Sequence, residues 1–102
     1  MQLNLNERFA VLQITPQEGN FATLKVVNDL RMVLSPTEAE FKEFEIHQEG
    51  EMLKWNGKGK EEREIKIGEK ATDIIVEALK KLDKEKKLTQ NQFSIYEKFN
   101  GI

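Results

Sequence analysis

The spacing of apolar residues around position 75 constrains the fold most strongly. Six of them recur at intervals of three and four positions: Ala71, Ile74, Ile75, Ala78, Leu79 and Leu82. This spacing places them on one stripe of an amphipathic α-helix, with charged residues such as Glu77 and Lys81 on the opposite face. Because such a helix owes most of its stability to burial of its stripe, the segment predicts a helix packed on a core.

The middle of the chain has a different period. Apolar and polar residues alternate in three runs, which Glu49-Gly50 and Asn56-Gly57 separate. Alternation with glycine-containing turns is typical of β-hairpins. We therefore predict an antiparallel three-stranded meander, with strands at about 44–48, 51–56 and 61–67. The connection from Asn56 to Lys60 contains two glycines, and we expect its tip to be mobile and to protrude.

A capping motif marks a helix before the meander. In Ser35-Pro36-Thr37-Glu38, Ser35 is the expected N-cap, Pro36 suits the first helical position and Glu38 completes a capping box. The predicted helix runs from Pro36 to about Phe44, with Phe41 and Phe44 on its inner side.

Two further segments precede it. Asn20 is the expected cap of a helix that keeps near-helical apolar spacing as far as Leu34. Residues 6–14 fit either a short helix capped by Asn6 or a strand, and the helix is slightly favoured.

The last predicted helix starts at Thr89-Gln90-Asn91-Gln92 and ends near Asn100-Gly101. It carries Phe93, Tyr96 and Phe99. The element order is then ααα-βββ-αα, which indicates an α+β fold with the helices packed on one face of a small three-stranded antiparallel meander. The chain has no repeat and no linker, so we expect residues 1–102 to form a single compact domain.

Composition excludes several classes of function. The chain has no Cys and one His, which excludes a disulfide framework, a thiolate zinc site, an iron–sulfur cluster and a cysteine nucleophile. A multi-histidine metal site within one chain is excluded as well. No apolar run approaches the ~18 residues of a membrane span, and the N-terminus lacks the pattern of a signal peptide. We therefore expect a cytoplasmic protein that binds no membrane.

The residues that carry chemistry form no catalytic motif. The carboxylates lack the spacing of a calcium loop, and Gly57-Lys58-Gly59-Lys60 lacks that of a phosphate loop. His47 titrates near neutrality and has Glu45 and Glu49 on its strand face, so a small hydrolase is a third and least favoured hypothesis. We predict a protein that is not an enzyme, with no catalytic, cofactor-binding or metal-binding residues.

Charge is unevenly distributed along the chain. Residues 1–50 hold four basic and eight acidic residues, whereas residues 51–102 hold twelve and ten. The acidic half predicts a surface that mimics nucleic acid toward a basic protein partner, on a helix that carries Glu38, Glu40 and Glu43. The hairpin with Trp55 is the second candidate surface, because aromatic residues are enriched at binding hot spots.

The same hairpin supports an alternative function. Trp55 beside a lysine-tipped turn resembles the wing of a winged-helix domain, whose basic hairpin rests along the phosphate backbone. A small DNA-binding protein would use the basic residues of this segment, Lys54, Lys58, Lys60 and Arg63. The acidic helix in the position of the reading helix would be repelled by phosphates, so a protein partner is favoured over nucleic acid. Self-association stays open, since an uncovered edge strand would allow a homodimer.

Three stretches are similar to small uncharacterised proteins encoded by bacterial phages and prophages. They are Glu7 to Lys25, Leu34-Ser35-Pro36-Thr37-Glu38, and Leu88-Thr89 through Tyr96-Glu97-Lys98-Phe99. The resemblance covers most of the chain and brings no known active residues. It implies a short accessory protein of the host cell cytoplasm that binds and modulates a host or phage protein, for example as an inhibitor of a host defence system.

Overall fold

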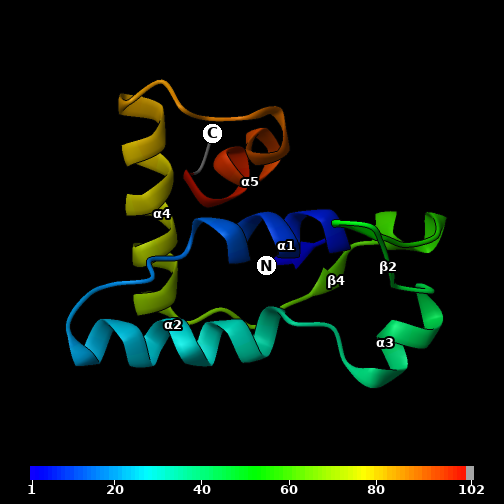
Figure 1. The fold of residues 1–102 in the computed structure, drawn as a ribbon. Helices are drawn as coiled ribbons and strands as arrows, with labels where there is room; N and C mark the ends of the chain where they lie inside the picture. Colours follow the sequence, from blue (N-terminus) through cyan, green and yellow to red (C-terminus); the bar gives the residue numbers. More distant parts are fainter. Residues whose placement is uncertain (101–102) are drawn as a thin grey trace.

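Helices make up most of the computed structural model, which describes residues 1–100 (Figure 1). The elements in chain order are β1 (Gln2–Leu3), α1 (Leu5–Ile14), α2 (Phe21–Leu34), α3 (Glu38–Glu43), β2 (His47–Glu49), β3 (Met52–Lys54), the 3-10 helix η1 (Gly57–Lys60), β4 (Arg63–Glu64), α4 (Glu69–Lys84) and α5 (Gln90–Asn100). The fold is therefore α+β, as predicted, but its strands are only two or three residues long.

The predicted three-stranded meander is wrong. The strands form two separate antiparallel pairs, β1 with β4 and β2 with β3. After β3 the chain leaves the hairpin through η1, so β4 pairs with the N-terminal residues, with Leu3 opposite Arg63. This pairing helps to bury Leu3 and Ile65 in the core. Two strand residues at the N-terminus carry no periodic signal, so the sequence pattern could not reveal this partner.

Helix starts follow capping motifs, although not always the predicted ones. Residues 5–14 are a helix, but its N-cap is Asn4 rather than Asn6, with Glu7 completing the capping box. The N-cap of α3 is Thr37, paired with Glu40, rather than Ser35 with Glu38. Two overlapping motifs of the same spacing compete here, and Ser35 instead ends α2.

Two other helix predictions are close to the structure, and a third is partly wrong. Asn20 caps α2, and its side chain accepts a hydrogen bond from the Thr23 N–H at 2.8 Å. The apolar stripe lies in α4, which extends two residues beyond it at each end. Phe44 is buried as expected, but Phe41 is 46% exposed, so its predicted place on the inner side is wrong. The helix is only six residues long and buries none of its own residues, and Phe44 is buried at its C-cap.

The core forms around α1 rather than on a sheet. Figure 1 shows α1 in the middle of the molecule, with α5 on one side, α2 on the other and α4 across one end. The residues buried at this centre include Leu3, Val11, Leu34, Ile75, Leu79 and Ile95. The expectation that the helices pack on one face of a sheet is therefore wrong, since the short β2 and β3 bury no residue. Among residues 1–100, no helix is long and apolar enough to cross a membrane.

Candidate protein-binding surface

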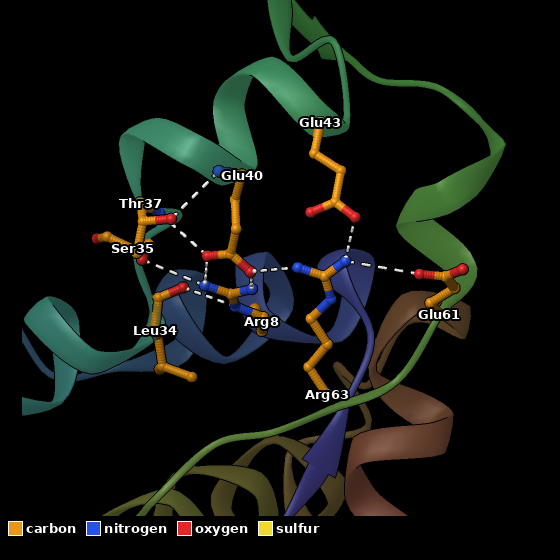
Figure 2. Close-up of polar contacts among 8 residues, drawn as sticks. All are labelled: Arg8, Leu34, Ser35, Thr37, Glu40, Glu43, Glu61 and Arg63. Carbon is orange, nitrogen blue, oxygen red and sulfur yellow. Dashed lines mark hydrogen bonds and ion pairs between the residues drawn. The ribbon is translucent and has the colours of Figure 1, made fainter.

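The acidic helix α3 is tied to the rest of the molecule by arginines (Figure 2). Arg8, on α1, donates from both terminal nitrogens to the Glu40 carboxylate, at 2.8 and 3.1 Å. Its Nε donates to the Leu34 carbonyl at 2.9 Å, so one buried guanidinium joins α1, the end of α2 and α3. Such a bidentate contact fixes the relative orientation of the two side chains as well as pairing their charges.

A second arginine reaches the same helix from β4. Arg63 donates to Glu43 at 2.6 Å and to Glu40 at 3.4 Å, and its Nη2 lies 3.5 Å from Glu61 (Figure 2). The guanidinium carbon also lies 4.6 Å from the centre of the Phe44 ring, a cation–π contact. Arg63 therefore holds α3 against β4 and covers the buried phenylalanine.

These contacts change the interpretation of the predicted acidic surface. Hydrogen bonds from Arg8 lower the pKa of the Glu40 carboxyl to about 2, against the opposing effect of burial. Hydrogen bonds from Arg63 lower the pKa of Glu43 as well. Two of the three predicted carboxylates are thus neutralised by arginines of the same chain. The third, Glu38, is exposed and forms no ion pair within the described part of the chain.

A second, partly buried ion pair, absent from the sequence predictions, ties α5 to the N-terminal region. Lys98 donates to the buried Glu7 carboxylate at 2.8 Å, to the Gln2 carbonyl at 2.8 Å and to Glu62. Burial would raise the pKa of Glu7, but hydrogen bonds from Lys98 and Asn4 outweigh it and lower the pKa. Lys98 and Glu7 are 91 positions apart, so sequence spacing held no signal for this pair.

Trp55 joins the segment after the hairpin to α1. Its ring lies 5.3 Å from that of Phe9, centre to centre and tilted by 43°, which is a favourable aromatic geometry. Gly59 is buried against the indole, and a Cβ at that position would overlap the ring. The predicted protruding tip is therefore wrong: residues 57–60 form η1, which packs on α1.

A groove of about 570 Å³ opens beside Trp55, between α1 and the β2–β3 hairpin. We call it the hairpin groove; its walls include Phe9, Gln13, Met52, Leu53 and Trp55. Met52 and Leu53 are 62% and 47% exposed, respectively, and every residue of both strands is exposed. Neither residue was among the predicted site residues. Neighbouring strand residues point to opposite faces, so two consecutive apolar residues already indicated that one of them faces away from any core.

The predicted basic residues are only partly free. Lys54, Lys58 and Lys60 are exposed on β3 and η1, and none has a carboxylate within ion-pair distance in the described part of the chain. Arg63, in contrast, is engaged by three glutamates. The basic candidate surface therefore consists of three lysines.

His47 lies on the exposed hairpin. Its Nδ1 lies 2.8 Å from the Glu45 carbonyl oxygen and its Nε2 lies 3.3 Å from the Glu49 carboxylate. These acceptors raise the pKa of the imidazole, the Glu45 carbonyl most strongly. Both ring nitrogens are thus occupied by residues of its own strand region. Within residues 1–100, no cluster of three or more His, Cys, Asp or Glu is arranged to hold a metal ion.

No protein-family model, curated protein or solved structure matches this chain.

Proposed function

We propose that this chain is a non-enzymatic protein-interaction module that binds its partner at the hairpin groove. The observation that carries the proposal is the exposure of Met52 and Leu53 beside the half-buried Phe9 and Trp55. Methionine and aromatic residues are enriched in the cores of protein interfaces. A partner that enters this groove would contact all four residues, because each of them lines it.

The hairpin itself supports the same surface. An isolated two-stranded hairpin is marginally stable in water, and its unpaired edges are ready to accept another strand. Its attachment is limited: Asn56 donates from its backbone N–H to the Phe44 carbonyl at 2.8 Å and from its side chain to Glu43 and Glu45. A bound partner would therefore stabilise the hairpin as well as occupy the groove.

Affinity capture with a matched pair of variants tests this function. The double variant Met52→Ser, Leu53→Ser removes the exposed apolar side chains, and we expect it to lose at least about tenfold in affinity for the captured protein. Phe93→Ser is the control, because Phe93 is equally exposed, at 61%, but does not line the groove. Capture from a native host lysate, with and without nuclease, reports whether the bound species is protein. Equal capture by both variants would overturn the proposal.

A small DNA-binding protein is the alternative, favoured by the three lysines without ion pairs, Lys54, Lys58 and Lys60. Gel-shift titration at two salt concentrations tests it, because affinity from phosphate contacts falls steeply with salt. The alternative requires binding that weakens with salt and is lost in the double variant Lys58→Ala, Lys60→Ala. Salt-insensitive binding, or binding that survives this variant, would reject it.

The similarity to phage and prophage proteins suggests a biological role for the module. It makes the partner a host or phage protein whose activity the module modulates, with inhibition as one concrete form. This role rests on the sequence resemblance alone. Identification of the captured protein by mass spectrometry, followed by an activity measurement with and without the module, tests it.

A further inference from the structure

The outer face of α2 is unusually apolar for a helix at the surface. Its exposed residues are Phe21, Ala22, Leu24, Lys25, Asn28, Asp29, Met32 and Val33. Five of these eight are apolar, and Phe21 and Met32 are 84% and 73% exposed, respectively. Large apolar side chains grouped on one exposed face mark interaction surfaces.

The outer face of α4, in the same chain, is different. It also has eight exposed residues, and all of them are charged: Glu69, Lys70, Asp73, Glu77, Lys80, Lys81, Asp83 and Lys84. Both helices bury one stripe in the same core, Val27, Leu30 and Leu34 in the case of α2. α4 therefore shows what a solvent-facing side looks like in this chain, and the outer face of α2 differs from it.

The outer residues of α2 follow the spacing of a helix–helix seam. Phe21, Lys25, Asn28 and Met32 are separated by four, three and four positions, which is the heptad pattern of packed helices. In Figure 1, α2 runs along one edge of the molecule, with α1 and α4 on its inner side. A second helix has access along the length of this edge.

The charges on this face identify the second helix. We propose that the outer face of α2 binds the same face of a second copy of the chain, with the two helices antiparallel. Lys25 lies two positions before Val27 and Asp29 lies two positions after it. A two-fold axis that crosses the outer face of α2 at the level of Val27 therefore places Lys25 of each copy against Asp29 of the other. The same axis brings Phe21 of each copy to Val33 and Met32 of the other, where sulfur–aromatic contact is favourable.

Within one chain these two charges are poorly used. Neither Lys25 nor Asp29 is in an ion pair in the described part of the chain. Their order along the helix, basic before acidic, is also the less favourable one for a pair four positions apart. In the antiparallel dimer, Lys25 and Asp29 of both copies are all paired, which makes two ion pairs. The polar Lys25 and Asn28 at the seam fix its register.

Sedimentation equilibrium, over a range from micromolar to millimolar protein, tests self-association. We expect a dimer that forms with concentration in the native chain and is lost in Met32→Glu, which places two added carboxylates in the seam. Phe93→Glu is the matched control at an exposed aromatic residue of α5, and we expect it to dimerise like the native chain. The Met52→Ser, Leu53→Ser variant is expected to dimerise normally as well, which separates this surface from the hairpin groove.

Charge reversal tests the antiparallel register. We expect Lys25→Asp and Asp29→Lys each to raise the dimer dissociation constant about tenfold, because two pairs become repulsive at once. The two variants mixed together should associate as a heterodimer, since each reversed charge then meets its complement. The chain with both reversals should dimerise like the native one. Circular dichroism confirms that each variant is folded.

Three outcomes would overturn the proposal. The first is a native chain that stays monomeric from micromolar to millimolar concentration, and the second is a Met32→Glu variant that dimerises like the native chain. The third is a mixture of Lys25→Asp and Asp29→Lys that associates no better than either variant alone. The last outcome would assign the face to a different register or to an unrelated partner.

Discussion

α4 and α3 lie in two regions of the molecule that are held in place by different forces. α4 buries Ala71, Ile75 and Leu79 in the core around α1. α3 buries none of its own residues and is held by Arg8 and Arg63 through its carboxylates. Figure 1 shows α4 at one end of the molecule and α3, with β2, at the other.

The two regions differ in how easily they are expected to open. Apolar packing around α4 is cooperative and involves most of the core, whereas α3 and the hairpin depend on a few directed contacts. Segments with few buried apolar contacts open locally at lower free energy than the core. We therefore expect the hairpin side of the hairpin groove to rearrange more easily than its other wall, which is formed by α1.

The largest effect is expected from the apolar region. Leu79 is fully buried, and Leu79→Ala should lower the free energy of unfolding by about 3 kcal/mol, through lost burial and a cavity. Urea denaturation followed by circular dichroism measures it. Because the core is shared, amide exchange should rise in α1, α4 and α5 together; a rise confined to α4 would contradict a common core.

Arg8→Met should have a smaller and more local effect. It removes both hydrogen bonds to the Glu40 carboxylate and the donor to the Leu34 carbonyl. We expect the free energy of unfolding to fall by about 2 kcal/mol. Arg63 still contacts Glu40, which limits the loss. Amide exchange should accelerate in α3 and the hairpin more than in α4. Arg31→Met is the control, because its one side-chain hydrogen bond, to Thr15, is long at 3.5 Å. Uniform acceleration across all helices would show that α3 is part of the core.

The pH dependence should be the smallest effect. The pKa of Glu40 is about 2 in the folded chain, below its ordinary value of 4.5. The unfolded chain therefore takes up this proton first, and the contribution of Glu40 is complete above pH 4.5 and lost as the pH falls toward 2. Denaturation midpoints measured across this window should fall less steeply in Glu40→Gln than in the native chain. An unchanged slope would assign the acid sensitivity to other carboxyls, such as Glu7.

Local signals predicted the helices, whereas distant contacts escaped prediction. The stripe from Ala71 to Leu82 and the Asn20 cap each lie within one segment, so periodicity and capping chemistry were enough. β1 was missed because its pairing with β4 depends on a residue some sixty positions away. The choice of Thr37 over Ser35 as N-cap was ambiguous, since two capping motifs overlap there.

The same distinction between local and distant contacts applies to the candidate site. Exposure of Lys58 and Lys60 after a hairpin could be inferred from their own segment. The fate of Glu40 and Glu43 could not, because the arginines that neutralise them come from α1 and β4. A charge count along the chain says how many carboxylates are present, but only the fold says which of them remain available to a partner.

The contact between Lys98 and the N-terminal region has a consequence for how the protein is made. α1 lies at the centre of the core, yet its partner α5 and the lysine that neutralises Glu7 are the last described parts of the chain to be synthesised. A nascent chain on the ribosome therefore carries α1 with an open apolar side and an uncompensated carboxylate until α5 emerges. Closure of the core is a late, long-range step, and chains with such contacts fold more slowly than those built from neighbouring helices.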